Sequence, residues 1–265
     1  MIEPPTIWTP SQVRAECRAG RWTRPTAGLA PRYVQANLMI LPREAAFDFL
    51  LFCQRNPKPC PLIEVLEPGR TGPSCAQGAD IRSDLPRYRV YQGGQLAGEV
   101  ADITSLWRED LVSFLIGCSF SFEEALAAAG VPLRHLERGR NVPMYQTNRP
   151  CAPAGRFAGP LVVSMRPIPA AKVALAVQVT ARFESAHGAH VHVGAPEALG
   201  IGDLGRPDYG DPAEVRPGEL PVFWAGGVTP QAVALASKLP FCITHAPGHM
   251  FVSDLQSASL DPAQS

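Results

Sequence analysis

Two histidines near the end of the chain, His245 and His249, are the first residues that could do chemistry. Both lie in the segment THAPGH. An imidazole titrates near neutral pH, so either residue could act as a general acid or base. Pro247 and Gly248 exclude the helix that would stack the two rings as metal ligands. The alternative is that His245 is a packed strand-end residue and His249 a turn residue.

A second group of candidates lies at the expected helix start GCSFSFEEAL. Free N–H groups and the helix dipole favour a carboxylate there and lower the pKa of a thiol. Cys118, Ser119 and Ser121 are therefore candidates, and Glu123 is a candidate acid or base. Ser121 and Glu124 also match a capping box, which would explain Ser121 without a ligand. Cys118 also falls on an apolar stripe, where it would be buried.

Hydrogen-bonding side chains gather on the irregular segment GRNVPMYQTN. Such groups hold carboxylates and amides, so Asn141, Thr147 and Asn148 are candidates for substrate binding and Tyr145 for proton transfer. Arg166, after the strand-like VVSM, could clamp a carboxylate through its planar guanidinium. The alternative for each of them is that it satisfies buried backbone groups.

Other polar clusters give weaker signals. His190 and His192 would share one strand face, but no spaced carboxylate or cysteine completes a metal site. We therefore predict no metal, and the sequence leaves any other cofactor open. The segment ADIRSD, residues 79–84, is either the edge of a site or a local ion-pair cluster. No P-loop, GxGxxG, GxSxG, HExxH or CxxC is present, which disfavours the enzyme classes that those motifs mark.

The elements that would position the candidates lie in residues 221–254. An apolar run ends at Gly226-Gly227, Thr229 and Pro230 begin a helix, and a second apolar run covers 241–244. A strand–helix–strand unit predicts parallel strands. Gly227, Thr229 and the HAPGH loop would then open on the edge where such sheets bind ligands, together with residues 141–147.

Apolar spacing predicts the remaining elements. In chain order we expect a helix over about 11–19, a helix from Pro42, a strand at 62–66, a hairpin around Gly93-Gly94, a helix from about Ser105 that carries Leu111, Phe114, Leu115 and Cys118, a long irregular segment at 139–160, and a strand–helix–strand unit over 161–193. This alternation is typical of an α/β fold.

Composition limits the protein class. A net charge of +0 gives no electrostatic footprint for nucleic acid or an anionic membrane, and the apolar run 111–122 is too short to span a bilayer. The N-terminus does not resemble a signal peptide, and seven cysteines without a CxxC pair favour reduced thiols in the cytoplasm.

The chain has 265 residues, which is long enough for two domains. We predict a smaller domain at 140–212 inserted into a larger one formed by 1–139 and 213–265. A homo-oligomer is compatible with this composition.

Seven segments together resemble the hydro-lyase family related to D-glutamate cyclase: NPKPCPLIEV, ADIRSDLPRYRVY, FLIGCSFSFEEAL, GRNVPMYQTN, GPLVVSMRPIP, FWAGGVTPQAV and ITHAPGHMF. The resemblance extends over nearly the whole chain. It implies a larger α/β sandwich domain with a smaller inserted two-layer α/β domain. It also implies a cysteine where this chain has Gly226, so we expect no thiolate mechanism at that position.

The leading prediction is a cytoplasmic hydro-lyase of amino acid metabolism that removes water from a small carboxylate, an amino acid or a hydroxy acid. Elimination needs a base and an acid. His245 or His249 would do one task, and Tyr145, Cys118 or Glu123 the other. Cyclisation of glutamate to 5-oxoproline also expels water and would use the same groups. The alternative is a non-catalytic module that binds an amino acid or an organic acid.

Overall fold

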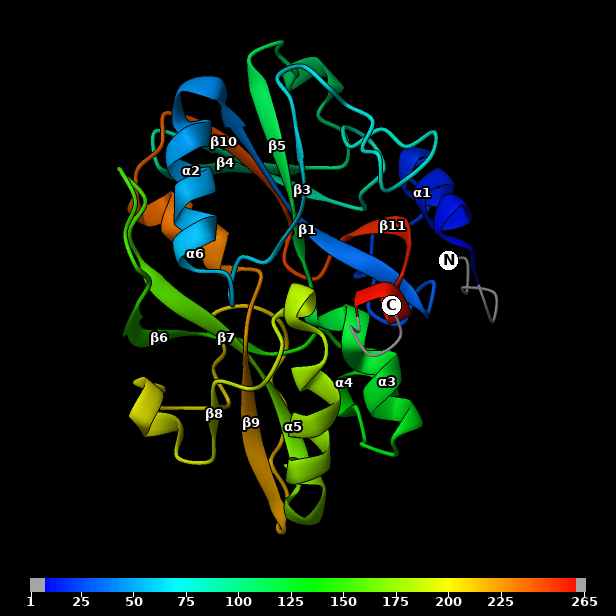
Figure 1. Cartoon of the computed structure of the whole chain (residues 1–265), viewed down its shortest axis with the longest axis vertical. Helices are drawn as coiled ribbons and strands as arrows, with labels where there is room; N and C mark the ends of the chain where they lie inside the picture. Colours follow the sequence, from blue (N-terminus) through cyan, green and yellow to red (C-terminus); the bar gives the residue numbers. More distant parts are fainter. Residues whose placement is uncertain (1–7, 261–265) are drawn as a thin grey trace.

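Two antiparallel β-sheets with helices packed against them form the fold, with the larger sheet above the smaller one in Figure 1. The computed structural model describes residues 8–260. Its larger sheet has seven strands and its smaller sheet has four, and the strands of the smaller sheet fall between β5 and β10 in the sequence. The predicted α/β class, with a larger part and a smaller inserted part, is confirmed.

The larger sheet is built around one long strand, β1. Its order is β2-β5-β1-β10-β3-β4, and β11 pairs with the first part of β1. Nine of the ten residues of β1 are buried, because the strand has neighbours on both edges and packing on both faces. The strands are β1 (Tyr33–Pro42), β2 (Leu62–Leu66), β3 (Tyr88–Gln92), β4 (Gln95–Val100), β5 (Leu111–Gly117), β10 (Phe241–His245) and β11 (Phe251–Gln256).

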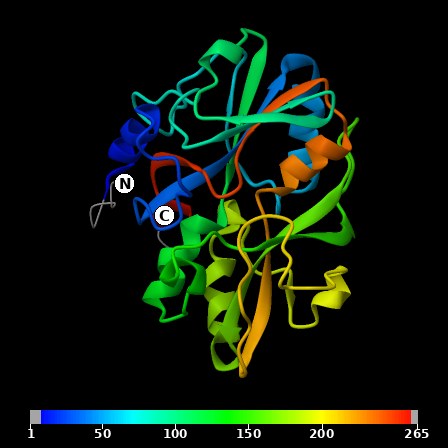
Figure 2. The same cartoon turned by 180° about the vertical axis from the view of Figure 1, so that it is seen from behind.

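The smaller sheet has the order β6-β7-β9-β8. Its strands are β6 (Met144–Pro150), β7 (Pro160–Pro169), β8 (His192–Val193) and β9 (Glu219–Ala225). One face packs on α3 (Glu123–Ala128) and α5 (Val173–Ala181), through a core that includes Phe122 and Trp224. Loops between β8 and β9 cover the other face, as Figure 2 shows from behind.

The other helices include α1 (Pro10–Arg18), α2 (Arg43–Arg55), α4 (Arg134–Glu137) and α6 (Thr229–Ala236). α2 and α6 pack on one face of the larger sheet, where Phe49 and Val233 join the same core. Six short 3-10 helices complete the described elements: η1 (Thr104–Leu106), η2 (Ser119–Phe122), η3 (Ala170–Lys172), η4 (Glu184–Ala186), η5 (Pro196–Leu199) and η6 (Ser257–Leu260). No helix within residues 8–260 is both long and apolar enough to cross a membrane.

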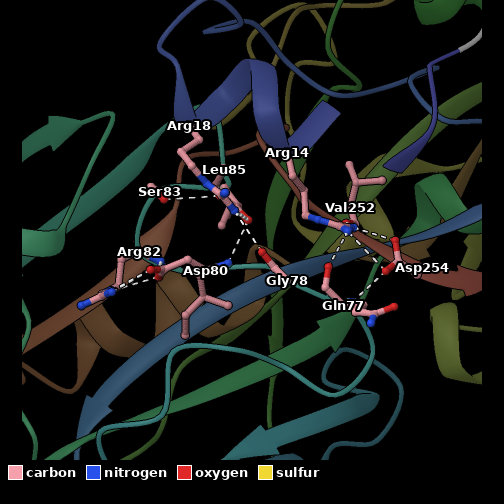
Figure 3. Close-up of polar contacts among 12 residues, drawn as sticks. Arg14, Arg18, Gln77, Gly78, Asp80, Arg82, Ser83, Leu85, Val252 and Asp254 are labelled. Atoms are coloured by element: carbon pink, nitrogen blue, oxygen red, sulfur yellow. Dashed lines mark hydrogen bonds and ion pairs between the residues drawn. The ribbon is translucent and has the colours of Figure 1, made fainter. Parts of the chain in front are cut away.

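Two arginines anchor α1 to the rest of the molecule (Figure 3). The buried Arg14 donates to the Val252 carbonyl at 2.8 Å and to both carboxylate oxygens of Asp254 at 2.8 and 3.2 Å. Arg18 makes a bidentate pair with the buried Asp84, with two N–O distances of 2.7 Å. Bidentate arginine–carboxylate pairs are strong and directional, so they fix the orientation of α1.

The same contacts show that ADIRSD is a local ion-pair cluster. Arg82 pairs with Asp80 two residues away, and Asp84 accepts the backbone N–H of Asp80 at 2.9 Å. Both carboxylates are therefore engaged by arginines. The segment holds α1 and the 75–85 loop together.

The predicted helix over 105–118 is wrong. Residues 111–117 form β5, which lies between β2 and β1. All seven of its residues are buried, so both faces of the strand are apolar and the alternation that marks a half-exposed strand is lost. A short continuous apolar run of this kind cannot be distinguished from a buried helix by periodicity.

The predicted parallel unit over 221–254 is also wrong. β9 belongs to the smaller sheet and β10 to the larger one, and α6 connects the two sheets. All strand pairs of the described chain are antiparallel. Residues 229–234 of α6 are all buried. A helix that covers one sheet keeps a polar face, and α6 lacks one because it packs against α2 and β7 as well.

Two smaller predictions also need correction. Ser121 does not cap a helix, because α3 begins after Phe122 without a side-chain cap and Ser121 Oγ accepts the backbone N–H of Gln35 at 3.1 Å. The irregular segment 139–160 contains β6. The helices at 10–18 and 43–55, the strand at 62–66, the hairpin at Gly93-Gly94 and the elements within 161–193 are confirmed. The boundaries of the inserted domain stay a prediction.

Candidate functional site

A buried network around Arg166 lies where β7 meets the start of α3. The Arg166 guanidinium donates to Glu123 Oε1 at 2.5 and 3.2 Å, to Ser119 Oγ at 3.0 Å and to Ser164 Oγ at 3.2 Å. His135 Nε2 donates to the same Glu123 oxygen at 2.9 Å. All five side chains are buried. The structure thus brings together three of the predicted site residues, Ser119, Glu123 and Arg166.

Aromatic packing and charge hold this network in place. The Arg166 guanidinium lies beside the neighbouring rings of Phe122 and Trp224, at 5.3 and 5.5 Å from their centroids. Burial alone would raise the pKa of Glu123, but the charges and hydrogen bonds of His135 and Arg166 lower it to about 2. Glu123 is therefore an anion at neutral pH and a weak base.

His187 lies directly after η4, which packs on η2. It is buried, and its backbone has a φ of 78°, the left-handed region that non-glycine residues rarely occupy. Its Nδ1 lies 2.9 Å from the Lys58 carbonyl oxygen, which can only accept, so Nδ1 carries the ring proton and Nε2 does not. Burial, together with the charges of Arg166 and Lys58, lowers the pKa of His187 to about 4. At neutral pH the site therefore holds a neutral imidazole whose tautomer is fixed.

Lys58, on the loop between α2 and β2, lines two pockets. One, of about 360 Å³, is lined by Lys58, Glu184 and His187. The other, of about 330 Å³, is lined by Lys58, His190 and Ala225, the last residue of β9. Much of the Lys58 surface is exposed at the rim, yet partial burial of its ammonium group lowers its pKa. We call these two pockets together the Lys58 cleft.

Close backbone contacts bring the walls of this region together. A Cβ added to Gly117, the last residue of β5, would lie 1.7 Å from the Ser185 carbonyl oxygen beside His187. A Cβ added to Gly227 would lie 1.9 Å from the amide of Asn37, which donates to the Gly117 carbonyl at 2.7 Å. The approach at Gly117 is to a backbone oxygen and allows only glycine, whereas a side chain at Gly227 would displace the buried Asn37 amide, so the predicted site residue Gly227 has a packing role.

Cys118 lies between β5 and η2, next to Ser119. Its Sγ accepts the backbone N–H of Phe120 at 3.5 Å. Burial raises the pKa of Cys118 to about 12, so the residue is a neutral thiol. This geometry does not provide the thiolate that a helix N-terminus was expected to favour.

The two histidines of THAPGH lie in the larger sheet and in the loop after it. His245 is buried on β10, and its Nδ1 accepts the backbone N–H of Leu38 at 3.1 Å. Burial lowers the pKa of His245 to about 3. His249 is half-buried, with Nδ1 at 3.0 Å from the Pro247 carbonyl oxygen. The 141–147 and HAPGH segments meet where Asn141 donates to the Pro247 carbonyl, and Val142 shares one apolar cluster with Val228 of GGVT and with Met250, which follows HAPGH.

The remaining predicted residues make contacts mainly with the backbone. Asn141 donates to the Pro247 carbonyl at 3.2 Å, and Tyr145 donates to the Leu204 carbonyl at 2.7 Å. Thr147 donates to the Leu161 carbonyl at 2.8 Å, and Thr229 donates to the Gly226 carbonyl at 2.7 Å. Asn148 is exposed. These contacts agree with the structural alternative for each residue.

Sequence reasoning missed Lys58 and His187. The chain has 24 Lys and Arg in total but only three lysines, so positions that need only a positive charge are almost always arginine. Lysine can give up its proton near neutrality and arginine cannot. A rare lysine such as Lys58, between Pro57 and Pro59, was therefore a detectable signal of proton transfer. The conformation of His187 had no such signal, because it depends on contacts with Lys58 and η2. No group of three or more His, Cys, Asp or Glu within residues 8–260 could hold a metal ion.

Comparison with known proteins gives consistent matches. The family model of D-glutamate cyclase matches residues 112–254. A "Putative hydro-lyase" of Stutzerimonas stutzeri is 62% identical over 253 residues, which cover 95% of this chain and 96% of the relative. Proteins of the same name are 61% identical over 261 residues in Bordetella petrii, covering 98% and 99%, and 60% identical over 250 residues in Saccharopolyspora erythraea, covering 94% and 98%. A nitrogen repressor-like protein of Methanococcus jannaschii has a TM-score of 0.41 at 10% identity, covering 94% of this chain and 98% of that one.

Proposed function

The chain belongs to the D-glutamate cyclase family, whose relatives are named as hydro-lyases, and from this premise we propose that it removes water from a small carboxylate in the Lys58 cleft. An amino acid or a 2-hydroxy acid is the proposed substrate. His187 takes the proton from carbon, and Lys58 protonates the departing oxygen. The seven cysteines are unpaired and buried, which supports a cytoplasmic location.

The observation that carries this proposal is the state of His187. Elimination needs a base that is free of its proton at neutral pH. The Lys58 carbonyl fixes the proton on Nδ1, and the pKa of about 4 keeps Nε2 unprotonated. The left-handed backbone is a costly conformation, and such conformations cluster at functional sites. The Lys58 carbonyl thus fixes the tautomer of His187, and the residue also lines a pocket.

The proton balance closes with Lys58. The C–H bond breaks and its proton moves to His187 Nε2, while the C–O bond breaks and the oxygen leaves as water with a proton from Lys58 Nζ. The two groups then exchange that proton through solvent at the rim. A lowered pKa makes the Lys58 ammonium a better acid. In glutamate cyclisation, the amine would attack the side-chain carboxyl and the same ammonium would protonate the departing hydroxyl.

Arg166 acts from behind the reacting groups. Its charge lies near enough to His187 to lower the pKa of the imidazole. Glu123 holds the guanidinium in one orientation through Oε1. We therefore treat Arg166 and Glu123 as positioning residues.

His187 and Lys58 suit proton transfer better than the two histidines of THAPGH. The His245 ring nitrogen Nδ1 already accepts a backbone N–H, and the residue lies inside the larger sheet. His249 remains a candidate, and its substitution separates the two assignments.

The test is turnover of a substrate panel by the purified protein. D- and L-amino acids and 2-hydroxy acids are incubated with the protein, and mass spectrometry follows the loss of one water. H187N and K58A should lower kcat by roughly a hundredfold or more. K238A, at an exposed lysine, and H249N should stay within about twofold. Full activity of H187N refutes the assignment, and saturable binding without product indicates a binding module.

A further inference from the structure

Lys58 lies on a part of the chain that is held from both sides. Its backbone carbonyl accepts a hydrogen bond from His187 Nδ1 at 2.9 Å. Two residues earlier, the buried Asn56 side chain donates to the Ala152 carbonyl at 2.8 Å and accepts the backbone N–H of Ala152 at 2.8 Å. These contacts fix the point from which the Lys58 side chain starts, and this side chain lines both pockets of the Lys58 cleft.

The Lys58 ammonium group has no fixed partner. It makes no hydrogen bond or salt bridge with any residue among 8–260. Partial burial lowers its pKa, and the charge of Glu184, which lines one of the two pockets, only partly offsets this. Each unit by which the pKa of a lysine falls raises the share of neutral amine at pH 7 about tenfold. A desolvated lysine of this kind is a nucleophile toward carbonyl carbon.

The two pockets of the cleft differ in charge. Glu184 lines the pocket that also contains His187, so an anionic group is disfavoured there. The other pocket, which contains His190, has no aspartate or glutamate among its described lining residues. The positive charge of Lys58 borders this second pocket and attracts a carboxylate to it. A molecule with a carboxylate next to its carbonyl group can therefore bring the carbonyl carbon to Lys58.

We propose that Lys58 Nζ forms an imine with a small 2-oxo acid, whose carboxylate occupies the pocket lined by His190. The neutral amine attacks the carbonyl carbon, and one proton of the amine moves to the oxygen, which gives a carbinolamine. The hydroxyl group then leaves as water with the second proton of the amine, and the N=C double bond forms. Imine formation does not depend on the dehydration proposed above, although an imine on Lys58 would inhibit that reaction.

The test is reductive trapping in the full-length protein with pyruvate and sodium cyanoborohydride at pH 7. Cyanoborohydride reduces the imine to a stable secondary amine, and peptide mass spectrometry measures the modification of each lysine. The chain has only three lysines, so each is followed separately. Lys58 should be modified at least roughly tenfold faster than Lys238, which is exposed and serves as the internal reference.

Two controls separate the cleft from the local sequence. In protein unfolded with guanidinium chloride, the advantage of Lys58 over Lys238 should disappear. Methyl pyruvate has the same ketone without the negative charge, so the Lys58 to Lys238 ratio should fall by about two- to fivefold, the value of one exposed ion pair.

The proposal is overturned if Lys58 reacts no faster than Lys238 in the folded protein. It is also overturned if the advantage of Lys58 persists after unfolding, or if pyruvate and methyl pyruvate give the same ratio. None of these readouts uses turnover, so the imine and the proposed dehydration can fail independently of each other.

Discussion

Replacing Glu123 by glutamine tests the physical basis of the buried network. The ordinary pKa of this carboxyl is 4.5 and its pKa in the folded protein is about 2. At about 1.4 kcal/mol for each tenfold change in proton affinity, ionised Glu123 stabilises the fold by about 3 kcal/mol at pH 7. A second estimate of the same loss comes from Arg166, because E123Q would leave its charge buried without a counter-ion, which costs about 3–5 kcal/mol. The two estimates of the destabilisation by E123Q agree.

The pH dependence has a definite sign. The pKa of Glu123 is lower in the folded than in the unfolded chain, so its contribution is fully present above pH 4.5 and is lost as the pH falls toward 2. About 1.4 kcal/mol of it should disappear between pH 7 and pH 3.5. E123Q lacks this group, so the stability difference between parent and variant should shrink by that amount.

Urea unfolding at pH 7 and pH 3.5 measures both quantities. E124Q is the matched control, because Glu124 is the next residue and its pair with Arg32 is exposed. It should change the free energy of unfolding by at most about 0.5 kcal/mol. An E123Q effect below about 1 kcal/mol, or a parent–variant difference that does not change with pH, would refute the account of the network.

Three further predictions follow from local geometry. R14A should lower the free energy of unfolding by about 2–3 kcal/mol because it removes a buried charge-assisted anchor of α1, whereas R21A, at an exposed pair, should leave it nearly unchanged in the same urea assay. G117A should cost about 3 kcal/mol or more because its Cβ meets a backbone oxygen, whereas G98A, with open space, should cost less than about 1 kcal/mol; equal thermal midpoints would contradict this. The kcat/KM for dehydration should rise as the pH rises through about 4 and stay level to neutrality, because His187 acts without its extra proton; a limb near pH 7 would point to another base.

The sequence alone was sufficient for elements whose signals are local. Thr9 and Pro10 mark the start of α1, and both the Thr9 cap and its Gln12 partner are present. The Gly93-Gly94 turn, with both glycines at positive φ, joins β3 to β4. Caps and turns act within a few residues, so their residue types are enough to predict them. Ser119, Glu123 and Arg166 were also singled out by residue type and position.

The tertiary structure decided which elements lie together. β5 is a strand because two neighbouring strands and two packed faces bury it, and no local pattern contains that information. β9 and β10 entered different sheets because their partners, β7 and β1, lie 50 residues or more away in the chain. His187 gained its tautomer and its lowered pKa from the Lys58 carbonyl, burial and Arg166, which only long-range packing brings to it. Local preferences act over a few residues, whereas sheet partners, desolvation and charge contacts depend on the whole folded chain.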